Sequence, residues 1–236
     1  MAFGQETPSH KEMIYLAYVA GRPDLWKKEI VKLNDIYLAN PGREELDELI
    51  MARYGYIPFC IQEGEKKEVS AELEEARKNL EVLREADPNN PEADALEAAF
   101  NGFEMVINPF RGIFLAAEAK ELTDKAYEDD PGCLTCISVK ANQLNFTPAI
   151  FGGSTEEAIP FYKEVISLYE SGQEEILYDW NYLNTMVIMA GAYEKLGQYN
   201  DACAVYEKIL VTEPGLNWVR NNLYPACLKK AKKNNN

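Results

Sequence analysis

Two cysteines three residues apart are the strongest candidates for chemistry in this sequence. Cys133 and Cys136 form a Cys-x-x-Cys pair directly after Pro131-Gly132, where a helix is expected to begin. In redox enzymes this spacing works at a helix N-terminus, because the helix dipole lowers the pKa of one thiol. No βαβ pattern surrounds the pair, and no further Cys pair or His group supplies zinc ligands. Two buried small residues are the simpler interpretation, and a redox dithiol is the alternative.

The other residue types that act in catalysis occur at unfavourable positions. His10 is the only histidine and lies near the N-terminus, whereas a Ser-His-Asp or Cys-His site needs its base inside a cleft. The 39 carboxylates fall on helix faces that we expect to be solvated. No glycine-rich phosphate loop follows a strand, because the sequence predicts no strands. We therefore expect no enzymatic activity and no cofactor or metal.

The composition describes an acidic chain with a sizeable core. Of its 236 residues 47% are hydrophobic, which is enough for one domain or one continuous solenoid. The net charge of −15 repels nucleic acid and anionic membrane surfaces, so neither is an expected partner. No run of about 20 apolar residues occurs, and no membrane insertion is expected.

The remaining cysteine pattern gives no sign of cross-links. A disulfide framework usually shows an even number of cysteines at recognisable spacings. This chain has five, at scattered positions, and we therefore predict free and mostly buried thiols. They are Cys60, Cys133, Cys136, Cys203 and Cys227.

The stretch from 183 to 216 has the pattern of two antiparallel helices. Gly197 ends the first helix, and Pro214-Gly215 ends the second. In the second helix Ala202, Tyr206 and Ile209 recur at helical spacing and predict one apolar face. Small residues on both helices allow the two to approach closely.

This stretch resembles a tetratricopeptide (TPR) repeat. The positions that match the repeat are Ala190, Tyr193, Gly197, Tyr199, Ala202, Tyr206 and Pro214. Met186 and Ile209 depart from it, at positions that usually hold a large aromatic and a small residue. The resemblance implies a helical solenoid that binds other molecules, and our leading hypothesis is a non-enzymatic scaffold whose concave face binds a protein or peptide.

Helix breaks recur along the whole chain and extend this interpretation. Breaks at Pro41, Pro88, Pro131, Ser171 and Pro214 are 40 to 47 residues apart, longer than the usual TPR period of about 34. They predict an all-α chain of about eleven helices, one solenoid over 1–236 with a capping helix at 217–232, and the resemblance to TPR repeats implies a right-handed superhelix. We interpret the extra residues, around 58, 108 and 146–153, as longer turns.

Two helices carry specific boundary predictions. Pro58 lies inside a helix expected over 43–62, where it should cause a kink or an early stop. The helix that opens the best-matching repeat is expected over 174–196. Ser154, followed by Glu157, should cap the helix before it.

The resemblance also places a binding groove along the first helix of each pair. Its groove-facing positions fall on polar and aromatic residues, which are Asn142, Asn145, Phe146, Asn184, Val187, Gly191, Glu194, Lys195, Trp218 and Asn222. Asparagines suit a peptide backbone and aromatic residues suit an apolar anchor, whereas the alternative is packing against neighbouring helices. Val187, Gly191 and Trp218 stand where chaperone-binding TPRs place clamp residues, which argues against a chaperone-tail adaptor.

A glycine-containing loop is the second candidate binding element. Pro148 and the segment Phe151-Gly152-Gly153 resemble a loop in exported bacterial TPR-like proteins, including partners of TRAP-type transporters. Two glycines permit close backbone approach, so a tight helix entry is the structural alternative. A closed apolar cavity near Ala99, Gly102 and Phe151 would favour a small-ligand-binding accessory protein of a bacterial transporter.

The N-terminal segment bears on localisation. Ala2-Phe3-Gly4-Gln5 resembles the end of signal peptides in Bacteroidetes, which predicts a mature exported protein of that type. An ordinary cytoplasmic N-terminus fits the same residues, because no apolar signal segment precedes them. Both localisations remain open at this point.

Overall fold

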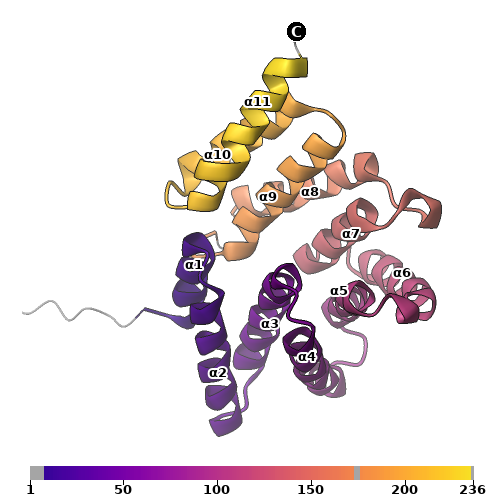
Figure 1. Ribbon diagram of the computed structural model, residues 1–236. Helices are drawn as coiled ribbons and strands as arrows, with labels where there is room; N and C mark the ends of the chain where they lie inside the picture. Colours follow the sequence, from indigo (N-terminus) through magenta and orange to yellow (C-terminus); the bar gives the residue numbers. More distant parts are fainter. Residues whose placement is uncertain (1–7, 173–175, 235–236) are drawn as a thin grey trace, which may run out of the picture.

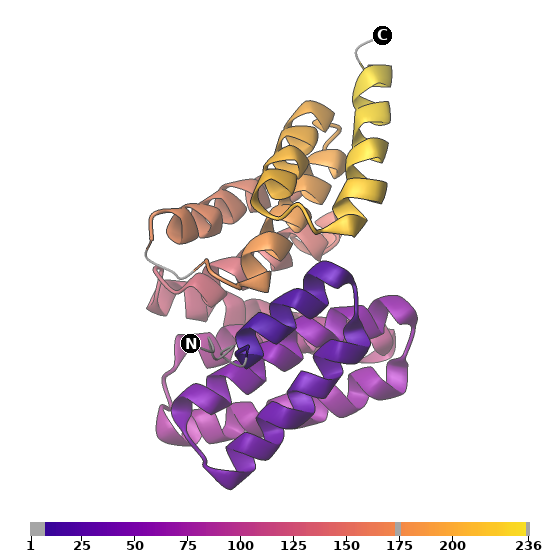
Figure 2. The same cartoon turned by 90° about the vertical axis from the view of Figure 1, so that its left-hand side faces the viewer.

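The computed structural model is a stack of antiparallel helix pairs (Figures 1 and 2). It describes residues 8–172 and 176–234, and these contain helices but no strand. The segment 2–5 therefore lies outside the described residues. The α-helices are α1 (His10–Ala20), α2 (Pro23–Ala39), α3 (Arg43–Glu63), α4 (Lys66–Ala86), α5 (Pro91–Ile107), α6 (Gly112–Asp129), α7 (Leu134–Phe146), α8 (Thr155–Glu170), α9 (Trp180–Lys195), α10 (Tyr199–Thr212) and α11 (Tyr224–Asn234).

Three short helical segments complete the fold. Two 3-10 turns, η1 (Pro109–Arg111) and η2 (Ala149–Phe151), lie in the α5–α6 and α7–α8 connections. They confirm the longer turns predicted around 108 and 146–153. A π-helical segment, η3 (Val219–Leu223), leads directly into α11. Within the described residues, no helix combines the length and apolar character needed to cross a membrane.

Local capping fixes several helix starts. The Ser154 hydroxyl accepts a hydrogen bond from the backbone N–H of Glu157, which confirms the predicted cap of α8. The Asp179 carboxylate accepts from two backbone N–H groups in the first turn of α9. Because Asp179 caps the helix, α9 begins at Trp180, and the prediction that this helix starts at 174 is wrong.

Helix α3 does not stop at Pro58. It continues to Glu63, and α3 and α4 each contain 21 residues. The extra residues of this pair therefore lengthen its helices, and the prediction of a longer turn or an early stop around Pro58 is wrong. A proline removes one backbone donor and crowds the preceding turn, and the packing of α3 in the core outweighs this local cost.

The pairs α1/α2, α3/α4, α5/α6, α7/α8 and α9/α10 follow one another in chain order, and α11 packs on α10. The first helices α3, α5 and α7 contact each other along the inner side of the stack. The superhelix curves so strongly that α1 contacts α9, as both views show (Figures 1 and 2). We call the side lined by α1, α3, α5, α7, α9 and α11 the concave surface.

An aromatic cluster fills the place where α1 and α9 meet. The rings of Trp26 and Trp180 lie 5.0 Å apart between centroids, and the ring centroids of Tyr18 and Trp180 are 6.2 Å apart. Tyr54 and Phe59 complete the cluster. The Trp26 indole N–H donates to the carbonyl of Ala52 at 2.9 Å, so its polar atom is satisfied inside the core.

Gly55 on α3 makes this approach of the helices sterically allowed. A Cβ atom at this position would lie 2.5 Å from the Trp180 ring and 2.6 Å from the Trp26 ring. Neither ring can move, because both are enclosed by the cluster. The absent side chain is therefore what lets Trp180 insert against α3.

The structure overturns the prediction of five free thiols. Cys203 on α10 and Cys227 on α11 form a disulfide, because the antiparallel packing of these helices brings the two residues together. Cys133 and Cys136 form a second one at the start of α7, where Cys133 is the residue before the helix and has an extended backbone. Only Cys60 stays free among the five, and it is buried.

Candidate functional site

The groove candidates on α7 mostly contact the chain itself. Asn142 accepts a hydrogen bond from the Tyr162 hydroxyl at 2.9 Å, and its amide N–H donates to the Tyr54 hydroxyl at 3.4 Å. Asn145 is buried, and its side-chain oxygen has no hydrogen-bond partner among the described residues. The carbonyl of Asn145 accepts from the Lys195 ammonium at 2.7 Å, which ties α7 to the end of α9.

The candidates near the start of α9 lie at the closed part of the concave surface. The Tyr18 hydroxyl of α1 donates to the side-chain oxygen of Asn184 at 3.5 Å. Val187 is buried one turn further along α9. Together with the aromatic cluster of Tyr18, Trp26, Tyr54, Phe59 and Trp180, these contacts form what we call the closed end.

Burial affects the tyrosine hydroxyl groups at and beside the closed end. It raises the pKa of Tyr54 to about 12, and it also raises the pKa values of Tyr18 and Tyr162 above the ordinary value of 10.0. The Tyr18 hydroxyl donates to Asn184 and the Tyr162 hydroxyl donates to Asn142, whereas the Tyr54 hydroxyl accepts from Asn142. Their arrangement serves packing and orientation of helices.

Other groove candidates remain accessible. Phe146 is 66% exposed at the end of α7, and Trp218 is 48% exposed just before η3. Lys195 and Asn222 are also exposed, and we call these four residues the open end. They lie in two places: Lys195 donates to the carbonyl of Asn145 beside Phe146, whereas Trp218 and Asn222 follow the turn at Glu213, which accepts a hydrogen bond from Tyr15 of α1. Glu194 is half-buried and pairs with Lys230 of α11, so its charge is already neutralised.

The glycine loop has the geometry of a tight helix entry. Gly152 has a φ of 89°, and a Cβ atom on Gly153 would lie 1.8 Å from the carbonyl oxygen of Thr147. The N–H of Ser154 donates to the carbonyl of Leu144 at 2.8 Å and folds the loop back on α7. Phe151 points outward, since it is largely exposed.

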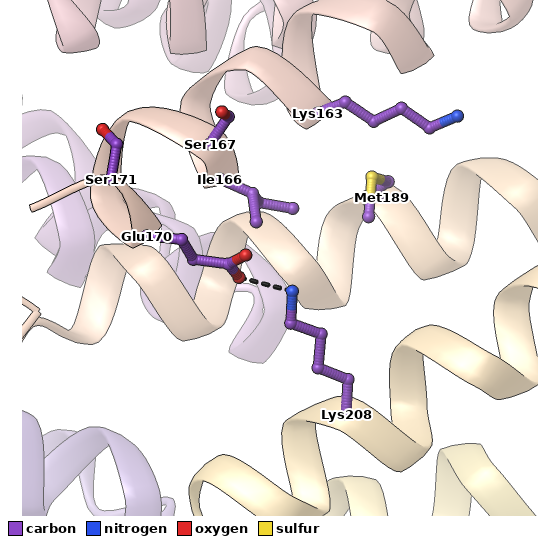
Figure 3. A pocket seen from close by; sticks show the side chains of 7 residues that line it. All are labelled: Lys163, Ile166, Ser167, Glu170, Ser171, Met189 and Lys208. Atoms are coloured by element: carbon purple, nitrogen blue, oxygen red, sulfur yellow. Dashed lines mark ion pairs between the residues drawn. The ribbon is translucent and has the colours of Figure 1, made fainter.

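A pocket that sequence reasoning missed lies between α8, α9 and α10 (Figure 3). Its volume is about 410 Å³. Figure 3 shows Ile166 and Met189 in the middle, with Lys163 and the Glu170–Lys208 ion pair on opposite sides. The lining residues are Lys163, Ile166, Ser167, Glu170, Ser171, Met189 and Lys208. They come from three separate helices, so no local motif could have identified the pocket.

The electrostatics of this pocket are largely balanced from within. Burial alone would raise the pKa of Glu170, but hydrogen bonds from Lys208 and Tyr182 outweigh it and lower the pKa. Glu170 therefore stays ionised and neutralises Lys208. The Lys163 ammonium lies 5.9 Å from the centre of the Tyr193 ring and has no carboxylate partner among the described residues.

A larger and more polar pocket, of about 750 Å³, lies between α4 and α5. Arg77 donates to Glu97 at 2.9 Å, to Asn101 at 2.9 Å and to Glu104 at 2.7 Å. Arg111 also pairs with Glu104. These contacts hold α4 against α5, and the buried amide nitrogen of Asn101 has no hydrogen-bond partner among the described residues. Neither pocket is lined by Ala99, Gly102 or Phe151, where a closed cavity would have favoured a small-ligand-binding protein.

Three more exposed apolar residues were not singled out from the sequence. Phe110 is 92% exposed, Ile150 is 85% exposed and Phe114 is 80% exposed, in or beside the α5–α6 and α7–α8 turns. The sequence did contain a signal for them. Residues 141–155 carry no charge, and residues 105–117 carry only that of Arg111, in a chain that is 27% charged.

Comparison with known proteins agrees with the repeat. Residues 185–215 match the tetratricopeptide repeat family, which confirms the resemblance found over 183–216. The chain is similar in structure to the HusA haemophore from Porphyromonas gingivalis, with a TM-score of 0.60 and 20% identity over 83% of this chain and 96% of that one. No curated protein matches the sequence significantly.

A second solved structure has the same architecture. The chain is similar to a thermophilic TPR protein from Thermus thermophilus, with a TM-score of 0.54 and 17% identity over 93% of this chain and 99% of that one. At sequence identities of 20% and 17%, these similarities concern the fold alone. The fold is therefore an all-α helical solenoid of the TPR type, as the sequence predicted.

Proposed function

We propose that this chain, a TPR-like helical repeat protein, is a non-enzymatic scaffold that binds a protein or peptide at the open end of its concave surface. The observation that supports this is the exposure of two large aromatic residues, Phe146 at the end of α7 and Trp218 just before η3. Large aromatic side chains are the usual anchors of protein interfaces. The closed end is occupied by the chain's own rings and leaves this part for a partner.

The polar groups of the open end suit a peptide backbone. Lys195 uses one of its three N–H donors on the carbonyl of Asn145, and the others can reach a peptide carbonyl. Asn222 is exposed and can both donate and accept. Val187 is buried and Gly191 has no side chain, so no pair of side chains is available at these two positions to clamp a terminal carboxylate. An internal segment of the partner is the expected ligand.

Selection from a displayed library of random peptides tests this function. Peptides enriched on the wild-type protein should bind Trp218→Ala and Lys195→Ala on the order of ten-fold more weakly. Leu38→Ala is the matched control, because Leu38 is an exposed apolar residue at the end of α2. The proposal fails if no peptide is enriched, or if the enriched peptides bind Trp218→Ala as well as the wild type.

A small flat ligand is the second candidate, and the likeness to a haemophore favours it. The open-end aromatics could stack on such a ligand, whereas the single histidine, His10, is hydrogen-bonded to Glu29 at 2.9 Å. Titration with haemin separates the two functions. A saturable change in the haemin absorbance that Trp218→Ala abolishes would favour a ligand carrier, and no change would favour the peptide scaffold.

The two disulfides support an oxidising compartment. Disulfides persist in exported proteins and are rare where the cytosol keeps thiols reduced. We therefore favour the exported alternative for localisation. The intact mass of the protein isolated from its own source without reductant should be lower by four hydrogen atoms than the reduced mass, and an unchanged mass would favour the cytoplasm.

The dithiol alternative is the least supported. Cys136 is fully buried and Cys133 is half-buried, so the pair offers little access to a disulfide substrate. Thiol–disulfide exchange requires direct attack by an accessible sulfur. An insulin-reduction assay with the wild-type protein should show no activity above that of Cys133→Ala/Cys136→Ala.

A further inference from the structure

Two turns at one edge of the solenoid expose a group of large apolar side chains. Phe110 and Phe114 belong to η1 and the first turn of α6, and Ile150 and Phe151 belong to η2. All four are more than half exposed, and Phe146 adjoins them at the end of α7. We call Phe110, Phe114, Ile150 and Phe151 the apolar edge.

The packing of α6 against α7 places both turns at the same end of the stack. Lys140 pairs with Asp124, and the Gln143 side chain donates to the carbonyl of Ala119 at 3.2 Å. The later residue of α7, Gln143, contacts the earlier residue of α6, Ala119, so the two helices are antiparallel. The start of α6 and the end of α7 lie side by side, which Figure 1 also shows.

The exposed area is large for a protein without a partner. Aromatic side chains bury about 150–250 Å² each, so these residues and Phe146 expose roughly 700 Å². The largest apolar patch of a typical monomer is about 300–600 Å². A standard protein interface buries about 800 Å² on each side, which is close to the area of this edge. The apolar edge is thus of a size that fits a stable interface.

The charges around the apolar edge define the chemistry of its partner. Glu118 follows Phe114 by one helical turn on the same face of α6, and Glu156 and Glu157 follow the η2 loop in the first turn of α8. All three are exposed, and none has an ion-pair partner among the described residues. Arg111, the one cation within the turns, is already paired with Glu104.

We propose that the apolar edge is a docking surface for an amphipathic segment of another protein, whose apolar face is bordered by lysine or arginine. Apolar contacts supply the binding free energy, and the unpaired carboxylates select the basic border. A second copy would bring the same carboxylates and a net charge of −15 against each other. An anionic membrane surface would be repelled for the same reason.

The proposal extends beyond the peptide site of the open end, because the four residues of the apolar edge are different and only Phe146 borders both sites. The test uses the full chain and a fluorescein-labelled 18-residue helical peptide with leucine on one face and lysine on the other. A matched peptide carries glutamate in place of every lysine. Fluorescence anisotropy should show saturable binding of the lysine peptide, weakened by added salt, and little binding of the glutamate peptide.

Variants locate the binding. Phe114→Ser/Ile150→Ser should weaken binding of the lysine peptide on the order of ten-fold or more, and Phe110→Ser provides an independent variant. Glu118→Gln/Glu157→Gln should weaken it several-fold and reduce the dependence on salt. Leu38→Ser, at an exposed apolar position on α2, should bind as the wild type does. Trp218→Ala should also leave it unchanged, which separates this test from that of the proposed function.

Several results would overturn the proposal. Equal binding of the two peptides, or equal binding by Phe114→Ser/Ile150→Ser and the wild type, would exclude the apolar edge as a basic-segment site. Sedimentation velocity showing a dimer that this double variant dissociates would assign the edge to a second copy. Flotation of the wild type, but not the double variant, with phosphatidylcholine vesicles would assign it to a lipid surface.

Discussion

The closed and open ends of the concave surface use the same residue types for different purposes. At the closed end Trp26 and Trp180 are enclosed by α1, α2, α3 and α9, and every ring contacts another ring. At the open end Trp218 and Phe146 are largely exposed. Strong curvature of the superhelix lets α1 reach α9 and fill part of the groove. The chain's own side chains therefore form a continuous core at the closed end, and only the rest of the concave surface is accessible to a partner.

This difference predicts opposite consequences of equivalent substitutions. A change at the closed end should lower the free energy of unfolding and leave a folded protein's surface unaltered. A change at the open end should alter binding and leave the free energy of unfolding nearly constant. The following predictions test this contrast, beginning with the largest expected effect.

Trp180→Ala should be the most destabilising of these changes. Removal of a buried aromatic side chain that contacts Tyr18, Trp26 and Tyr54 costs about 3–5 kcal/mol. Trp218→Ala is the matched control and should change stability by only about 0.5–1 kcal/mol. Urea unfolding followed by circular dichroism measures both. Similar losses for the two variants would mean that the closed end is not a distinct core.

Removal of the Cys203–Cys227 disulfide should have the next largest effect. The cross-link spans 24 residues, and loss of a loop of this length from the unfolded ensemble costs about 3 kcal/mol. Cys203→Ala/Cys227→Ala should therefore show a lower urea midpoint than the oxidised wild type. Cys133→Ala/Cys136→Ala, which opens a much shorter loop, should lose less. An equal loss in both variants would argue against a chain-entropy origin.

Gly55→Ala should lower stability by about 1–3 kcal/mol, because the added Cβ overlaps the Trp180 and Trp26 rings. Gly191→Ala is the matched control in an exposed part of α9, where no atom lies within 4 Å of the added Cβ. It should stabilise the protein by up to about 1 kcal/mol through helix propensity. Thermal unfolding should thus shift in opposite directions, and a gain for Gly55→Ala would contradict the tight approach of α9 to α3.

The smallest predicted effect concerns pH. Burial raises the pKa of Asp179 above the ordinary value of 3.8, in spite of the N–H groups that it caps. The folded state therefore binds the proton more tightly than the unfolded state, and the charged form reduces stability as the pH rises through this interval. Asp179→Asn keeps a good capping residue and removes this charge.

The thermal midpoint of Asp179→Asn should exceed that of the wild type most clearly at pH 7. The difference should shrink as the pH falls below 3.8, where the wild-type carboxyl becomes protonated in both states. Differential scanning calorimetry over this pH range measures it. A difference that grows at acid pH would show that the pKa of Asp179 is lowered by folding.

The fold could be predicted because its signals are local. Helical periodicity, Gly197 and the Ser154 cap indicated helix pairs, and the repeat over 185–215 fixed the architecture. The Cys203–Cys227 bond and the entry of Trp180 against Gly55 depend on helices that are distant in sequence or on the curvature of the stack. The spacing of apolar residues along single helices does not predict such long-range contacts.

The sequence predicted which positions could line the candidate site, but not which of those residues would be accessible. Transferred groove offsets identified inner-helix residues, but they could not show that Asn145 and Val187 would be buried while Trp218 stayed exposed. That division depends on how tightly the superhelix curves, which is set by the sum of many helix contacts. The apolar edge had a sequence signal, the uncharged residues 141–155, but its two turns meet only through the α6–α7 packing.

Acrylamide quenching of tryptophan fluorescence tests the division of the concave surface most directly, because the chain has three tryptophans and they lie at both ends. The wild type should show a quenchable fraction from Trp218, and Trp218→Phe should lose it, since Trp26 and Trp180 are buried. Quenching in Trp218→Phe as strong as in the wild type would contradict a closed end and place an open groove between α1 and α9.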